Sequence, residues 1–118
     1  MSPQIISLSG PVAPESSTPA ADRLIAGAPS QTISNHFTDS TEQFFAGEWS
    51  STPGKWRVRY TENELCVMKR GRVIITSDDG APAMFATGDA FVIPAGFSGT
   101  WEVVEDCTKI YAIFESRT

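Results

Sequence analysis

Residues 78–96, with the sequence DDGAPAMFATGDAFVIPAG, contain three turn signals at close intervals. Glycine in each of them tolerates the positive φ angles that tight turns need. The apolar segments between the turns are four residues long, a length typical of short strands. The three turns are Asp78-Asp79-Gly80, Thr87-Gly88-Asp89 and Pro94-Ala95-Gly96. Such alternation of brief apolar segments and turns is typical of a β-sandwich or a β-barrel.

The same spacing continues on both sides of this stretch. The sequence predicts strands at 42–49, 55–61, 65–69, 72–77, 83–86, 90–93, 100–104 and 108–115, with 65–69 and 72–77 joined by a turn at Gly71. One helical turn is expected at 20–26, and no helical apolar period is long enough for an amphipathic helix. Because strands do not alternate with helices, a parallel sheet is not expected and an all-β fold is predicted.

The chain divides by composition into an N-terminal segment and a strand-rich remainder. Five of the eight prolines lie before residue 30, among Ser, Ala and Gly residues. This composition predicts an irregular N-terminal arm over 1–40 without a core of its own. Residues 41–118 are predicted to form a single barrel domain, since a chain of 118 residues has enough apolar material for one core.

Charge and composition exclude several classes of function. The formal net charge is −5, which argues against a nucleic-acid partner because phosphate binding needs clustered Lys and Arg. No apolar run is long enough to span a membrane, and the N-terminus lacks the pattern of a signal peptide. We therefore expect a cytoplasmic protein with neither membrane nor nucleic-acid partners. Cys66 and Cys107 are expected to be buried thiols in a reducing compartment rather than a disulfide or a redox pair.

Two stretches resemble the paired motifs of the cupin superfamily. Residues 88–99 match the second motif (Gly, five residues, Pro, one residue, Gly, two residues, His) except that Gly99 stands at the histidine position. The first motif ends with Glu, six residues and Gly, which fits Glu64 to Gly71. Its two histidine positions are occupied by Arg57 and Arg59. The resemblance implies a cupin-type double-stranded β-helix, or jelly-roll, barrel with an internal pocket.

The residues around these motifs are similar to the sequences of the small single-domain cupins grouped with the ureidoglycine aminohydrolase cupin domain. The similarity extends from about residue 22 to the C-terminus and includes 52–58, 64–71 and 88–102. Most members of that group have no assigned reaction, so the resemblance implies the fold more than the function. Ureidoglycine aminohydrolase itself is a longer, manganese-dependent enzyme with two cupin domains.

If the motif register holds, the side chains at the former histidine positions point into the barrel, and alternation places their i±2 neighbours there too. On the last strand, periodicity allows either face to point into the pocket. The resemblance favours the face that carries Lys109 and Tyr111. Excess positive charge in such a pocket would favour a small anionic ligand, because guanidinium matches carboxylate and phosphate groups. The pocket residues predicted in this way are Arg57, Arg59, Glu64, Cys66, Trp101, Lys109 and Tyr111.

Alternation within 55–61 also allows the opposite orientation, in which Trp56, Val58 and Tyr60 face the core. Burying three large apolar groups is worth several kcal/mol, about 2 for each, whereas burying two guanidiniums is costly. Both arginines would then lie in solvent. A bulge that turns only one arginine inward, with Glu64 as its counter-ion, is a third arrangement, and the sequence leaves all three open.

A metal cofactor is not expected in this barrel. Transition metals need several imidazole, carboxylate or thiolate donors, and Glu64 with Cys66 makes a poor set beside two cationic side chains. The single histidine, His36, lies outside both motifs and is expected at the surface or an interface. A metal site would require the arm of a partner subunit to deliver His36 into the barrel.

Three functions compete at this point. The leading hypothesis is a metal-free cupin, either an enzyme or a metabolite sensor, that binds a small anionic or ureido-type compound. The second is a metal-dependent enzyme similar to ureidoglycine aminohydrolase. The third is a non-catalytic dimerising module whose barrel is filled with side chains. A homodimer is expected, with the proline-rich arm as the segment that clasps the partner.

Overall fold

The computed structural model describes residues 3–117, which form nine β-strands and no helix. None of these residues belongs to a helix that could cross a membrane. The strands are β1 (Glu15–Ser17), β2 (Leu24–Gly27), β3 (Gln31–Thr38), β4 (Phe44–Ser51), β5 (Gly54–Arg59), β6 (Asn63–Ser77), β7 (Pro82–Ala86), β8 (Ala90–Ile93) and β9 (Ser98–Phe114). The all-β prediction is confirmed.

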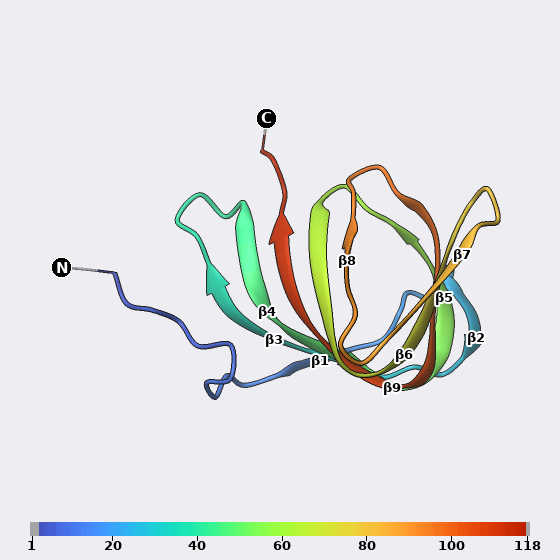
Figure 1. Cartoon of the computed structure of the whole chain (residues 1–118), viewed down its shortest axis with the longest axis horizontal. Coiled ribbons are helices and arrows are strands. Elements are labelled where there is room, and N and C mark those ends of the chain that lie inside the picture. The colour runs from blue at the N-terminus through green and yellow to red at the C-terminus, as the bar shows by residue number, and fades with distance from the viewer. Residues whose placement is uncertain (1–2, 118) are drawn as a thin grey trace.

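One antiparallel sheet contains all of these strands and curls on itself into a jelly-roll barrel (Figure 1). The longest strand, β9, is its centre. The first half of β9 pairs with β5 and the second half pairs with β4, while β6 runs along its other edge for almost the full length. Residues far apart in the sequence therefore meet inside the barrel, on the inner faces of β4, β5, β6 and β9.

Gly71 lies inside a strand rather than in a turn. The expected strands 65–69 and 72–77 are one continuous strand, β6, whose pairing with β9 shifts register between Met68 and Val73. Gly71 has a φ of 89°, and a Cβ there would overlap the carbonyl oxygen of Asp106. Glycine thus lets β6 bend against β9 without interrupting the sheet. In the same way, 100–104 and 108–115 are parts of the single strand β9.

The N-terminal segment is more ordered than the sequence predicted. The helical turn expected at 20–26 is wrong, because residues 21–23 form a turn that leads into β2, which pairs with β5. β3 pairs along the length of β4, and β1 pairs with β3. A boundary at residue 40 would thus separate β3 from the strand to which it is hydrogen-bonded. The composition of the N-terminal segment predicted an irregular arm. Backbone hydrogen bonds from neighbouring strands nevertheless impose β-structure on much of this segment.

The core consists of large apolar side chains from β5, β6, β8 and β9. Two aromatic contacts link it to the inner face of β4, where Trp49 packs against Trp56 and Trp101 with ring centroids 6.1 and 5.5 Å away. Trp56 and Trp101 are paired across β5 and β9, which explains their stacking. The buried cluster comprises Trp56, Met68, Val73, Ile75, Ile93, Trp101, Val103 and Cys107.

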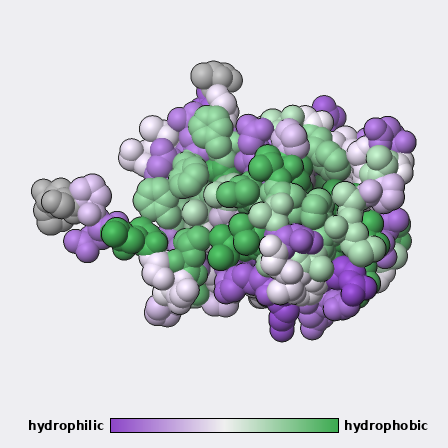
Figure 2. All heavy atoms as spheres, in the orientation of Figure 1, coloured by the Kyte–Doolittle hydropathy of each residue, from purple (hydrophilic) through white to green (hydrophobic). Residues whose placement is uncertain are grey.

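Exposed apolar side chains also gather on the side of the sheet that faces away from the core (Figure 2). Phe44 pairs with Phe114 across β4 and β9, and Leu65 pairs with Val92 across β6 and β8. All four are exposed, Val92 to 60%. We call this surface, defined by Phe44, Leu65, Val92 and Phe114, the outer face. Apolar residues on adjacent strands make it a continuous patch rather than scattered single side chains.

Candidate functional site

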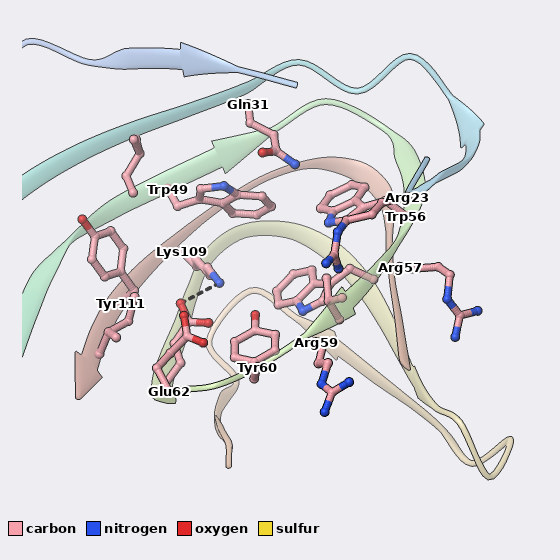
Figure 3. A pocket seen from close by; sticks show the side chains of 15 residues that line it. Arg23, Gln31, Trp49, Trp56, Arg57, Arg59, Tyr60, Glu62, Lys109 and Tyr111 are labelled. Atoms are coloured by element: carbon pink, nitrogen blue, oxygen red, sulfur yellow. Dashed lines mark hydrogen bonds and ion pairs between the residues drawn. The ribbon is translucent and has the colours of Figure 1, made fainter. Parts of the chain in front are cut away.

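A cavity of about 330 Å³ opens between β4, β5 and β9 on the inner side of the sheet (Figure 3). Its size is near the lower end of the range for small-molecule sites. Aromatic and charged side chains from these strands and from the segments next to them line it. They are Arg23, Gln31, Ile33, Trp49, Trp56, Arg57, Val58, Arg59, Tyr60, Glu62, Glu64, Trp101, Lys109, Tyr111 and Ile113.

A buried ion pair lies at the cavity wall. Lys109 on β9 and Glu64 on β6 are 5% and 4% exposed, and the Lys109 Nζ donates to Glu64 Oε2 at 2.9 Å. Burial alone would lower the pKa of Lys109, but the Glu64 carboxylate and the neighbouring Cys66 sulfur together raise it above its ordinary value. The site therefore carries a fixed ammonium and a fixed carboxylate, and their charges cancel.

Two tryptophans hold the ammonium from its other sides. The Lys109 Nζ lies 4.5 Å from the ring centroid of Trp101 and 4.8 Å from that of Trp49. Lys109 is the β9 partner of Trp49 on β4, so the sheet register itself brings the cation to that ring. Cation–π attraction compensates part of the desolvation of the ammonium. The pair is thus built into the wall by packing as well as by charge.

Two tyrosines add hydroxyl groups. Tyr111 donates to Asn35 Oδ1 at 2.7 Å, and burial raises its pKa to about 12. Burial, reinforced by the Glu64 carboxylate, raises the pKa of Tyr60 well above its ordinary value. Both groups therefore remain protonated donors at neutral pH. Trp101 contributes another donor, because its Nε1 is buried and makes no hydrogen bond.

Arg57 and Arg59 do not point into the barrel. Both are exposed, and their side chains extend away from the cavity at its mouth (Figure 3). Arg57 makes an exposed ion pair with Asp78 at 3.2 Å rather than with Glu64. The inward orientation taken from the cupin motifs is wrong for this strand, because Trp56, only 7% exposed, occupies the inner face with its i+2 neighbours.

The third former histidine position has a steric reason to be glycine. A Cβ at Gly99 would overlap the carbonyl oxygen of Thr76, since β9 and β6 approach closely there. Gly99 pairs with Val58 on one side and with Ser77 on the other. No side chain, histidine included, fits at this position without moving the backbone. The motif spacing is thus retained while its ligand is sterically excluded.

The remaining predicted pocket residues differ in their positions. Glu64, Trp101, Lys109 and Tyr111 all line the cavity. Cys66 is fully buried behind the ion pair, where its Sγ accepts from Lys109 Nζ at 3.5 Å, so it supports the site without lining it. Its burial raises the pKa of the Cys66 thiol to about 12.

Both cysteines are free and buried, as expected, and His36 lies outside the cavity. The imidazole Nε2 of His36 is 2.9 Å from the carbonyl oxygen of Gly10, so the ring links β3 to the N-terminal segment of its own chain. The sequence did not single out Trp49 or Arg23 as lining residues. Arg23 is held there by a backbone bond, since Arg57 N–H donates to its carbonyl oxygen at 2.9 Å.

The donor set does not fit a transition metal. Among residues 3–117, no group of three or more His, Cys, Asp and Glu side chains is close enough to hold an ion. Glu64 and Cys66 are both directed at the Lys109 ammonium, which takes the place a cation would occupy between them. A metal there would face the repulsion of that ammonium. We therefore derive no chemistry through a metal.

The jelly-roll barrel and its internal cavity together define a small cupin. The EutQ-like cupin domain family matches residues 38–111, more than half of the chain, and the chain belongs to that family. The comparison with curated proteins found no match.

Solved structures of related proteins agree with this assignment. A DUF861 family protein of unknown function from Pseudomonas syringae is 25% identical with a TM-score of 0.80, covering 92% of this chain and 46% of that protein. A DUF861 family protein from Thermotoga maritima is 30% identical with a TM-score of 0.53, covering 54% of this chain and 73% of the other. The EutQ protein of Clostridium difficile shares the fold at 17% identity and a TM-score of 0.67, and the match covers 75% of this chain and 65% of that protein. This chain thus spans less than two thirds of the first and last of these proteins.

Proposed function

We propose that this protein binds a small anionic or ureido-type metabolite in the barrel without a metal. The observation that carries the proposal is an open, aromatic-lined cavity with a buried Lys109–Glu64 ion pair in its wall. A cupin that served only as a filled structural module would gain stability by packing apolar side chains in this space. A desolvated ion pair beside an empty volume is instead typical of a binding site.

The charges around the cavity support an anionic ligand. Arg23, Arg57 and Arg59 lie at its mouth, where Glu62 is the acidic lining residue. Their guanidiniums are exposed and would attract a carboxylate or phosphate from solvent. Ureido compounds are included because of the sequence resemblance to the ureidoglycine aminohydrolase cupin domain. Their planar, uncharged ends also suit aromatic walls.

Calorimetric titration with N-carbamoylglycine, a small ureido acid, tests this function on protein treated with a chelator. We expect binding with a dissociation constant below about 1 mM. Glu64→Gln should weaken binding, whereas Glu48→Gln, which alters an exposed ion pair with Lys69, should not. Binding that appears only after manganese is restored would favour the metal-dependent alternative. Absence of binding under both conditions would favour the structural module.

We also propose that a second copy of this chain covers the outer face. The four exposed residues that define it lie on adjacent strands and form an uncharged apolar surface that can pack against its own two-fold copy. The N-terminal segment supports the same partner, because it extends from the barrel with Ile5 99% exposed (Figure 1). The outer face and the N-terminal segment are both apolar and both exposed. A homodimer would bury each of them against a second copy of the chain.

A further inference from the structure

The cavity has one buried hydrogen-bond donor without an acceptor. Trp101 is 2% exposed and lines the cavity, and its Nε1–H makes no hydrogen bond. The Tyr60 hydroxyl lies close enough for this N–H to oppose the rise in the Tyr60 pKa, but the indole Nε1 has no acceptor at hydrogen-bond distance and angle. A buried donor without a partner costs free energy in the absence of ligand, and buried polar groups nearly always find partners. An acceptor atom brought by a ligand would satisfy it.

The charge of that acceptor is restricted by its neighbours. Glu64 already accepts from Lys109, and it also faces the Tyr60 hydroxyl. A ligand carboxylate beside Trp101 would place two negative groups on one ammonium in a desolvated site, which is unfavourable. A neutral carbonyl oxygen carries no such penalty. The Glu64 carboxylate can in turn accept an N–H from the ligand, since an ionised carboxylate has about four acceptor positions.

Negative charge is better placed at the mouth of the cavity. Arg23 lines the mouth, and within residues 3–117 it makes no ion pair. The Arg59 side chain extends away from the cavity (Figure 3). Arg57 is engaged with Asp78. Guanidinium groups at a solvent-exposed rim bind carboxylates without the cost of burying a second charge.

We propose that the ligand binds in one orientation, with an amide-type group (a C=O next to an N–H) against Trp101 and Glu64 and a carboxylate at Arg23. This inference rests on the proposed function and specifies the chemistry at each end of the site. The recognised class is a small cyclic or planar amide that carries a carboxylate on the opposite side. A lactam acid is the simplest example.

Three matched probes test the two ends of the site separately. The first is 2-pyrrolidone-4-carboxylate, which has both the lactam and a carboxylate on the ring carbon opposite it. The second is cyclopentanecarboxylate, which lacks the lactam, and the third is 2-pyrrolidone, which lacks the carboxylate. Binding is followed on unaltered, ¹⁵N-labelled protein through the indole N–H signals of its three tryptophans. We expect the lactam acid to bind at least about tenfold more tightly than either partial probe, because each leaves one end unpaired. The Trp101 indole proton should move downfield with the two lactam probes and not with cyclopentanecarboxylate.

Variants at the mouth give a second readout. Arg23→Gln should weaken binding of the lactam acid and leave 2-pyrrolidone unaffected. Arg72→Gln is the matched control, because Arg72 pairs with Glu105 and does not line the cavity. Equal binding of cyclopentanecarboxylate with an unmoved Trp101 signal would overturn the orientation while leaving a carboxylate-binding cavity. Failure of all three probes at about 10 mM would overturn the orientation. The calorimetric titration with N-carbamoylglycine then decides separately whether the proposed function also fails.

Discussion

Lys109 and Glu64 show how a metal-cupin motif can keep its glutamate and change its chemistry. The glutamate of the first motif is retained, but its partner here is an ammonium from β9. Lys109 is therefore the internal cation of the barrel, held by charge on one side and by two indole rings on the other. The pair has a high desolvation cost, so it is sensitive to the loss of either member.

Removing one member of this pair should be strongly destabilising. Lys109→Met leaves the Glu64 carboxylate buried without a counter-charge, and we expect a loss of about 3–5 kcal/mol in the free energy of unfolding, measured with urea. The double variant Lys109→Met/Glu64→Gln should recover part of this loss. Lys69→Met is the control, since the exposed pair it breaks with Glu48 is worth about 1 kcal/mol or less. Equal losses at the two lysines would contradict this account.

The same pair predicts a dependence of stability on alkaline pH. The pKa of Lys109 is raised in the folded state above its ordinary value of 10.5. A group with a raised folded pKa stabilises the protein fully below its unfolded pKa and loses that contribution as pH rises through the folded value. Above about pH 10.5, the free energy of unfolding of the wild type should therefore fall relative to the Lys109→Met/Glu64→Gln variant. A constant difference between the two proteins up to about pH 12 would refute the assignment.

At the scale of single elements, the bend of β6 over β9 positions the site. Glu64 and Cys66 lie before the bend, and the core residues Val73 and Ile75 lie after it, all on the inner face. The local register shift allows one strand to contribute to the cavity at one end and to the core at the other. Gly71 permits that shift.

Substitution at Gly71 should therefore cost more than substitution at an unrestricted glycine. Gly71 and Gly80 have nearly the same φ, 89° and 90°, but only Gly71 has backbone atoms in the space of a Cβ. We expect Gly71→Ala to lower the free energy of unfolding by about 3 kcal/mol or more, and Gly80→Ala by about 1 kcal/mol. Thermal and urea unfolding of both variants measure the difference. Similar losses would mean that conformation alone, without the clash, determines the cost.

For the molecule as a whole, the outer face should control the association state. Val92→Glu places a charge at the most exposed residue of the apolar patch, and we expect it to convert a dimer into a monomer in sedimentation experiments at micromolar concentration. Met84→Glu is the control, because Met84 is equally exposed, at 61%, but lies on β7 away from this face. A wild-type protein that sediments as a monomer would contradict the proposed homodimer.

Most of the fold could be predicted from the sequence because turns and alternation are local properties. The turns at 78–80, 87–89 and 94–96 occur as predicted, each with its glycine at positive φ. The two long strands were predicted as four pieces, because bends inside a strand resemble turns in sequence. The N-terminal segment was predicted as irregular, since its strands form only through hydrogen bonds to partners distant in the chain.

By itself, the sequence determined the all-β class, the positions of most strands and the three arrangements open to 55–61. Tertiary structure decided among those arrangements, because only the assembled barrel shows that Trp56 stacks on Trp101 while Arg57 and Arg59 reach solvent. It also decided that Lys109 meets Glu64, 45 residues away, through the pairing of β9 with β6. Alternation assigns a side chain to one of two faces, but which residues meet across the sheet depends on long-range register, which no local pattern encodes.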